Sequence, residues 1–107
     1  MPRRKKKRKG GRPPLEFSGD LLDATPAATL DLHGDTALEA QRRVRDFVAT
    51  HARISRGKVI HIITGRGRLG KAVLPDAVRR VLSGESSRFI QEFDKDLDEA
   101  GYLVRLK

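Results

Sequence analysis

Two side chains that can transfer protons lie two positions apart in Leu30 to Gly34, whose sequence is LDLHG. Apolar and polar residues alternate there with the period of two of a β-strand, so the Asp31 carboxylate and the His33 imidazole are expected on one face. Residues two apart on a strand are separated by roughly 7 Å, close enough to act on one ligand. The pair is therefore a candidate acid–base site.

A second candidate segment, Thr64 to Gly67 with the sequence TGRG, follows the apolar run Val59–Ile63. Its paired glycines allow backbone N–H groups to approach a phosphate closely, and nearby basic side chains can add charge-assisted hydrogen bonds. The Walker spacing GxxxxGK[ST] is absent, which argues against hydrolysis of nucleoside triphosphates. The residues predicted to bind phosphate or nucleic acid are Gly34, Thr64, Gly65, Arg66, Gly67, Arg68 and Lys71.

Hydrophobic periodicity predicts the elements that position these motifs. A first strand is expected from near Thr29 to Gly34, followed by a helix over Ala37–Ala52 that begins at a capping box. The β-branched run Val59–Ile63 predicts a buried strand parallel to the first. Parallel pairing would place LDLHG and TGRG side by side at the carboxyl ends of two strands, where ligands bind in open α/β sheets.

The rest of the chain predicts a helix over Ala72–Leu82 and two final strands over Phe89–Phe93 and Tyr102–Leu106. The resulting order, βαβαββ, indicates an α/β protein of the two-layer α+β sandwich type with a four-stranded mixed sheet. We expect residues 1–28 to form a basic disordered tail and linker, and residues 29–107 to form the domain.

The remaining histidines have structural interpretations. His61 lies between two isoleucines, which favours a buried, hydrogen-bonded core residue. His51 stands near the end of the long predicted helix, where it favours the negative end of the helix dipole. Neither is assigned to the candidate site.

The formal net charge of +9 is concentrated at the N-terminus. Of 23 basic and 14 acidic residues, eight basic ones and no acidic one lie in residues 1–12, which leaves 15 against 14 in the remainder. Such a block repels itself and favours a polyanionic partner. Tail contacts with nucleic acid are expected from Arg3, Arg4, Lys5, Lys6, Lys7, Arg8 and Lys9.

Composition excludes several classes of protein. The chain of 107 residues has room for one α/β domain, and the lack of cysteine excludes disulfides, thiolate metal sites and a cysteine nucleophile. No residue set predicts a bound metal. The sequence has no apolar stretch that resembles a secretory signal or a membrane span, so we expect a cytoplasmic protein without a membrane partner.

LDLHG, a helix, IITGRG at Ile62 to Gly67 and a helix ending in VRRVL at Val78–Leu82 together resemble the Smr (small MutS-related) domain. The resemblance covers about residues 29–107. It implies a fold like the C-terminal domain of bacterial translation initiation factor three, and nicking of DNA or cleavage of RNA. One departure concerns residues 98–102, which read DEAGY where many members carry a glycine-rich GGxGA turn.

The leading functional hypothesis is therefore an endonuclease. On RNA, His33 would act as general base or acid and Asp31 would orient it or share the proton transfer, without any cofactor. On DNA, water would need activation, for example by a divalent metal ion on Asp31. The alternative is a non-catalytic module that binds nucleic acid or ribosomes. The choice between RNA and DNA, the cleavage preference and the oligomeric state stay open at this stage.

Overall fold

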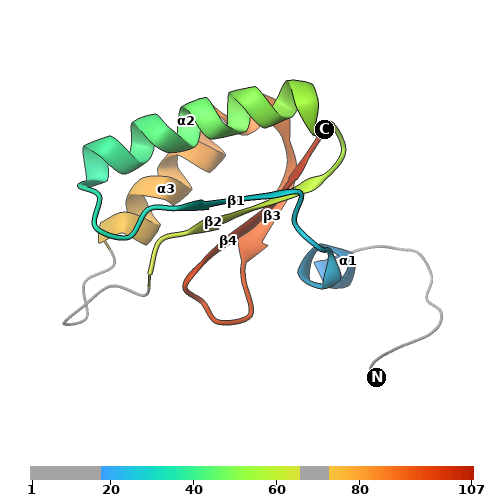
Figure 1. The fold of residues 1–107 in the computed structure, drawn as a ribbon, viewed down its shortest axis with the longest axis horizontal. Helices are drawn as coiled ribbons and strands as arrows, with labels where there is room; N and C mark the ends of the chain where they lie inside the picture. The colour runs from blue at the N-terminus through green and yellow to red at the C-terminus, as the bar shows by residue number, and fades with distance from the viewer. Residues whose placement is uncertain (1–17, 66–72) are drawn as a thin grey trace.

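The computed structural model describes residues 18–65 and 73–107 and places two long helices over one face of a four-stranded sheet (Figure 1). The sheet order is β1-β2-β4-β3, with β1 parallel to β2 and the other two pairings antiparallel. This confirms the predicted βαβαββ order and mixed sheet. In chain order the elements are α1 (Ser18–Asp23), β1 (Ala28–Asp31), α2 (Ala37–Ile54), β2 (Val59–Ile63), α3 (Val73–Ser83), the 3₁₀ turn η1 (Ser87–Phe89), β3 (Ile90–Lys95) and β4 (Gly101–Leu106).

The predicted capping box fixes the start of α2. The Thr36 hydroxyl accepts a hydrogen bond from the Glu39 N–H at 3.2 Å, and the Glu39 carboxylate accepts one from the Thr36 N–H at 3.0 Å. These bonds satisfy two N–H groups that would otherwise lack partners at the helix start. The helix runs two residues beyond the predicted Ala52, and Ser55 caps its C-terminal end.

The main core lies between the helices and the sheet. It is built from the inward faces of α2 and α3, from alternate residues of β2 and β4, and from Leu32 just after β1. Ile60 and Ile62 of β2 are fully buried there, as the alternation of a sheet covered by helices requires. The buried residues are Leu32, Ala40, Val44, Val48, Ile60, Ile62, Val78, Val81, Leu82, Ile90, Tyr102, Val104 and Leu106.

The opposite face of the sheet is partly covered by α1 (Figure 1). Leu21 of this helix is 1% exposed and packs against Val59 and Leu103, whose side chains point away from the main core. Residues 18–23 lie within the range expected to be tail and linker, but they form a helix with its own small apolar cluster. A helix this short depends on that tertiary contact.

Strand boundaries differ slightly from expectation at two places. The first strand ends at Asp31 rather than Gly34, because a turn begins there. Phe89 belongs to η1, so β3 runs over Ile90–Lys95 instead of Phe89–Phe93, with an irregular register between Ile90 and Glu92. No helix in residues 18–65 or 73–107 is long and apolar enough to span a membrane.

Candidate functional site

The two sequence motifs meet at one edge of the sheet. Asp31 at the end of β1 pairs with Ile63 at the end of β2, and the Leu32 N–H donates to the Ile63 carbonyl oxygen at 2.9 Å. Thr64 is the next residue after this pair. The turn that carries His33 and the start of the TGRG segment therefore leave the sheet beside each other, as parallel pairing predicts.

The Asp31 side chain shapes the turn that follows it. Its Oδ1 accepts a hydrogen bond from the His33 backbone N–H at 2.9 Å, which is the geometry of an Asx turn. Gly34 has a φ of 89°, a left-handed conformation that favours glycine, and its surroundings are open. The carboxylate thus has a structural bond through one oxygen while the residue itself stays exposed.

Arg43 on α2 braces the same turn. Its Nη1 lies 2.8 Å from Asp35 Oδ2 in an ion pair and 3.4 Å from the Asp31 carbonyl oxygen. Because the Arg43 charge is matched by Asp35, we do not count this guanidinium as a free phosphate ligand. Its contacts hold the backbone between β1 and α2.

His33 is exposed at the edge of the sheet, and its ring has no hydrogen-bond partner among residues 18–65 and 73–107. An exposed imidazole can take up a proton from a ligand at this edge or deliver one to it. The described part of the chain contains no group of three or more histidine or acidic residues arranged to hold a metal ion.

The start of the TGRG segment is tied to the turn between β3 and β4. The N–H groups of Thr64 and Gly65 both donate to the Ala100 carbonyl oxygen, each at 2.9 Å. The Thr64 side chain is buried, and its hydroxyl lies 2.7 Å from the Gly65 carbonyl oxygen. Two N–H groups that the sequence suggested for a phosphate cradle therefore have protein acceptors, which gives these two residues a structural role.

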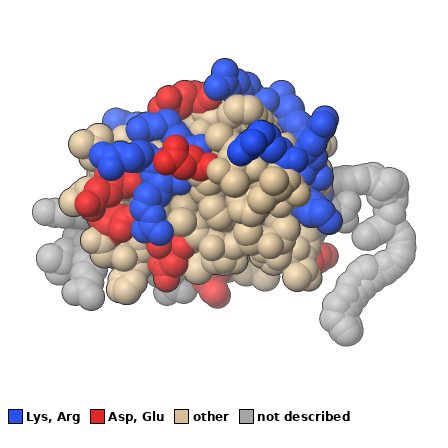
Figure 2. Space-filling view, turned by 45° about the horizontal axis from the view of Figure 1, so that its top comes forward, with Lys and Arg blue, Asp and Glu red and all other residues tan. Residues whose placement is uncertain are grey.

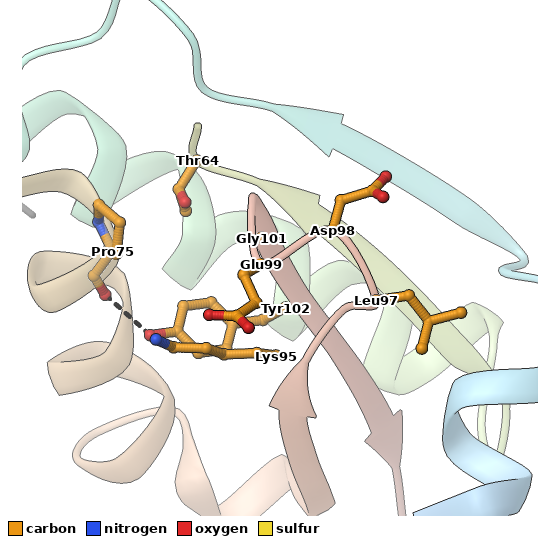
Figure 3. Close-up of a pocket in the computed structure, with 8 residues that line it drawn as sticks. All are labelled: Thr64, Pro75, Lys95, Leu97, Asp98, Glu99, Gly101 and Tyr102. Atoms are coloured by element: carbon orange, nitrogen blue, oxygen red, sulfur yellow. Dashed lines mark hydrogen bonds between the residues drawn. The ribbon is translucent and has the colours of Figure 1, made fainter. Parts of the chain in front are cut away.

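A cavity of about 460 Å³ opens between this segment, the start of α3 and the β3–β4 turn (Figure 3). The Tyr102 hydroxyl donates to the Pro75 carbonyl oxygen at 3.2 Å across its floor. Burial raises the pKa of this hydroxyl, with a further increase from Asp76 that Arg79 opposes. Asp31 and His33 do not line the cavity. The lining residues are Thr64, Pro75, Lys95, Leu97, Asp98, Glu99, Gly101 and Tyr102.

The sequence was compared with profiles of known protein families. The sequence profile of the Smr domain matches residues 30–102, a span that includes both motifs, the whole of β2 and β3, the second half of β1 and the first two residues of β4. The chain belongs to the Smr domain family. A search of curated protein sequences finds no significant match.

The β3–β4 turn is where this Smr domain departs from the glycine-rich pattern. Glu99 has a φ of 56°, a left-handed conformation that an L side chain adopts at a cost of about 1–2 kcal/mol. In GGxGA a glycine would stand at this position. Asp98 and Glu99 are the acidic residues of the cavity lining and Lys95 is its basic residue, within the part of the chain that the structure describes.

Gly101 retains the glycine of that pattern for a steric reason. A Cβ built on it would lie 2.2 Å from the Ile62 carbonyl oxygen and 3.0 Å from the Ile63 Cα. Strands β2 and β4 could not keep their present spacing with any side chain at this position.

Sequence reasoning missed a pair on the sheet face opposite α2 and α3. His61 Nε2 and Asp96 Oδ2 are 2.8 Å apart, with side-chain exposures of 24% and 11%. The expectation of a hydrogen-bonded His61 is confirmed, although the residue is only partly buried. Asp96 Oδ1 also accepts from the Ala100 N–H at 2.9 Å, so a chain of bonds joins His61 to the turn that holds Thr64.

The surroundings of Asp96 perturb its ionisation. Burial alone would raise the pKa of this carboxyl, but the hydrogen bonds from His61 and the Ala100 N–H, with the charge of His61, lower it below its usual value. Asp96 gives no local sequence signal, because its partner lies 35 positions earlier.

His51 is hydrogen-bonded to the end of its own helix. Its Nδ1 is 2.9 Å from the Ser55 hydroxyl, and its ring packs against Phe47 with centroids 4.6 Å apart. Several predicted site residues lie outside the described residues. They are Arg3, Arg4, Lys5, Lys6, Lys7, Arg8, Lys9, Arg66, Gly67, Arg68 and Lys71.

Proposed function

We propose that this Smr domain is an endonuclease that cleaves phosphodiester bonds of RNA or DNA, with Asp31 and His33 as its acid–base pair. The supporting observation is that both residues are exposed at the sheet edge where β1 ends and the TGRG segment begins. An extended polymer can reach such an open edge without entering a deep cavity.

On RNA the reaction needs only proton transfer and charge stabilisation. His33 removes the proton of the 2′-hydroxyl, whose oxygen attacks the adjacent phosphorus, and the P–O5′ bond breaks to give a 2′,3′-cyclic phosphate and a 5′-hydroxyl. The leaving oxygen takes a proton from the imidazolium or from water. Asp31 stabilises the charged imidazole through space and fixes the turn that carries it.

The negative charge of the reacting phosphate has to be stabilised by basic groups near this edge. The sequence offers Arg66, Arg68 and Lys71 for that purpose, and the basic N-terminal tail for sequence-independent affinity. On DNA, which lacks the 2′-hydroxyl, a divalent ion on the Asp31 carboxylate would have to activate water. Cleavage in EDTA therefore separates the two chemistries.

The test uses Asp31→Asn and His33→Ala with labelled RNA and DNA, in EDTA or with added Mn²⁺. An asparagine oxygen can still accept the His33 N–H, so Asp31→Asn should keep the turn while it removes the negative charge. We expect both variants to cut roughly 10²- to 10⁴-fold more slowly. Asp46→Asn, which removes an exposed carboxylate from α2, serves as the matched control and should cut like the parent.

A non-catalytic binding module is the second candidate. It is favoured by the acidic residues in the β3–β4 turn and by the protein acceptor that occupies the Thr64 and Gly65 N–H groups. Tight binding of RNA or DNA without cleavage by the parent would replace the endonuclease proposal with this one. Cutting by folded His33→Ala and Asp31→Asn at the parent rate would remove the two residues from the mechanism.

A further inference from the structure

A second cavity, of about 360 Å³, lies at the end of the sheet opposite the candidate site. The last turn of α2, the turn before β2, η1 and the end of β4 enclose it. We call it the α2-end pocket. Its lining residues are Ala52, Arg53, Arg56, Arg88, Phe89 and Lys107.

Backbone hydrogen bonds hold the walls of the α2-end pocket together. The Gly57 N–H donates to the Lys107 carbonyl oxygen at 3.2 Å, and the Lys107 N–H donates to the Phe89 carbonyl oxygen at 3.0 Å. The turn after α2 is closed by the bond from the Lys58 N–H to the Ser55 carbonyl oxygen at 3.0 Å. The three segments thus present their side chains from a fixed frame.

The lining of this pocket carries positive charge without a balancing acid. All its charged side chains are basic, and none of them has an ion-pair partner within residues 18–65 and 73–107. Elsewhere in that part of the chain, Arg43, Arg45 and Arg105 are each paired with a carboxylate. Figure 2 shows blue gathered where α2 ends, and red interspersed with blue on the other half of this face.

Neighbouring groups do not cancel this charge. The C-terminal end of α2 contributes a partial charge of about −0.5, which is small beside four basic side chains. A free α-carboxylate at Lys107 would still leave the lining strongly positive. The Arg88 guanidinium lies over the Phe89 ring, 4.8 Å from its centroid, which restricts its rotamers and keeps its N–H groups available for an anion.

We propose that the α2-end pocket binds the phosphodiester backbone of the nucleic acid whose scissile bond lies at the Asp31–His33 edge, an inference that rests on the proposed function. Helix α2 sets the separation, because it begins just after that edge and ends at the pocket. Its 18 residues span roughly 25 Å at 1.5 Å per residue. This distance corresponds to about seven base pairs of B-DNA.

The test measures binding of a fluorescent 16-base-pair duplex to the full chain as a function of salt. Because each lost phosphate contact changes the logarithmic salt slope by about 0.9 for duplex DNA, the double variant R53Q/R56Q should lower the slope by roughly 1.8 and weaken binding about 60-fold at 0.1 M salt. The matched control R42Q/R80Q removes two exposed arginines that lie outside the pocket and should weaken binding much less.

Folding is checked independently. Removing mutually repelling charges should leave the thermal midpoint of R53Q/R56Q equal to the parent value or raise it at low salt. If the double variant does not fold, Arg53→Gln alone, at an exposed helical position, should still lower the slope by about 0.9.

The following results would overturn the proposal. If R53Q/R56Q and R42Q/R80Q lose the same amount of duplex affinity, net charge alone determines binding. Pocket-dependent binding of inorganic pyrophosphate with unchanged duplex binding would assign the pocket to a free phosphate compound. Unchanged duplex binding with pocket-dependent binding of polyglutamate would assign it to an acidic protein. If the parent binds no nucleic acid at all, the proposed function fails, whereas tight parent binding that R53Q/R56Q leaves unchanged rejects the pocket alone.

Discussion

Replacing Gly101 by alanine should destabilise the domain strongly. The new Cβ would lie 2.2 Å from the Ile62 carbonyl oxygen, so β2 and β4 would have to separate by roughly 1 Å to reach ordinary contact. Both strands are interior in the sheet order β1-β2-β4-β3, and the clashing atoms belong to the backbone. We therefore expect a loss of about 3 kcal/mol, at the upper end of the usual overpacking range.

The matched variant is Gly34→Ala. It adds the same methyl group at a glycine whose constraint is conformational rather than steric. Nothing lies within 4 Å of a Cβ at Gly34, but its φ of 89° is unfavourable for alanine. That strain of about 1–2 kcal/mol is partly offset by the lower entropy of the unfolded chain, which leaves a loss of about 1 kcal/mol. The pair separates a steric cost from a conformational one.

Thermal unfolding of the full chain by circular dichroism measures both. At about 4–8 °C per kcal/mol for a domain of this size, Gly101→Ala should lower the midpoint by roughly 12–24 °C, and Gly34→Ala by about 4–8 °C. A Gly101→Ala midpoint within a few degrees of the parent, or a larger drop in Gly34→Ala, would show that the close approach of β2 and β4 is wrong.

Three further predictions concern other parts of the domain. Glu99→Gly removes the strain of a left-handed residue and should raise the thermal midpoint by a few degrees, since about 1–2 kcal/mol of strain exceeds the entropic cost of glycine. A lower midpoint would contradict this. Nucleic-acid affinity should also rise, because a carboxylate is lost. The pKa of Asp96 is lower in the folded state than its usual value of 3.8, so the ionised carboxylate stabilises the fold above pH 3.8, and this contribution is lost as pH falls through the folded-state pKa. The urea midpoints of the parent and Asp96→Asn should therefore differ at pH 7 and approach each other as pH falls below 3.8, and a constant difference would exclude this linkage. Leu21→Ala should cost about 2 kcal/mol in urea unfolding, because Leu21 is 1% exposed, and an unchanged midpoint would mean that α1 is not docked on the sheet.

The sequence predicted the parts of the fold that rest on local periodicity. The capping box before α2 and the β-branched run of β2 each act over a few residues, and the structure confirms them. Alternation in LDLHG predicted the presence of β1, but the strand ends at Asp31, and His33 lies in the turn that follows it. The order of a short strand, a long helix and a short strand predicted that β1 and β2 pair in parallel, because few other arrangements connect two such strands. The catalytic role of that edge stays a prediction.

What the sequence could not predict depends on contacts between distant residues. The acceptor of the Thr64 N–H is Ala100, and His61 meets Asp96, in both cases across about a third of the chain. Helix α1 has no strong periodicity, and it packs on the sheet through the cluster formed by Leu21 with Val59 and Leu103. For the β3–β4 turn, one signal was present in the sequence. It reads DEAGY where many Smr domains carry GGxGA, and Glu99 of this turn adopts a left-handed conformation.

The docking of α1 also determines where the basic N-terminal segment is tethered. Leu21 contacts Val59 at the start of β2, which is the end of the sheet that holds the α2-end pocket. Whatever conformation residues 1–17 adopt, their reach from this anchor cannot exceed roughly 60 Å. A nucleic acid bound to the domain therefore meets these charges as part of the same complex, at an effective concentration that does not depend on the bulk concentration of the protein. Loss of the α1 anchor would lengthen the tether and dilute that partner without removing a single charge.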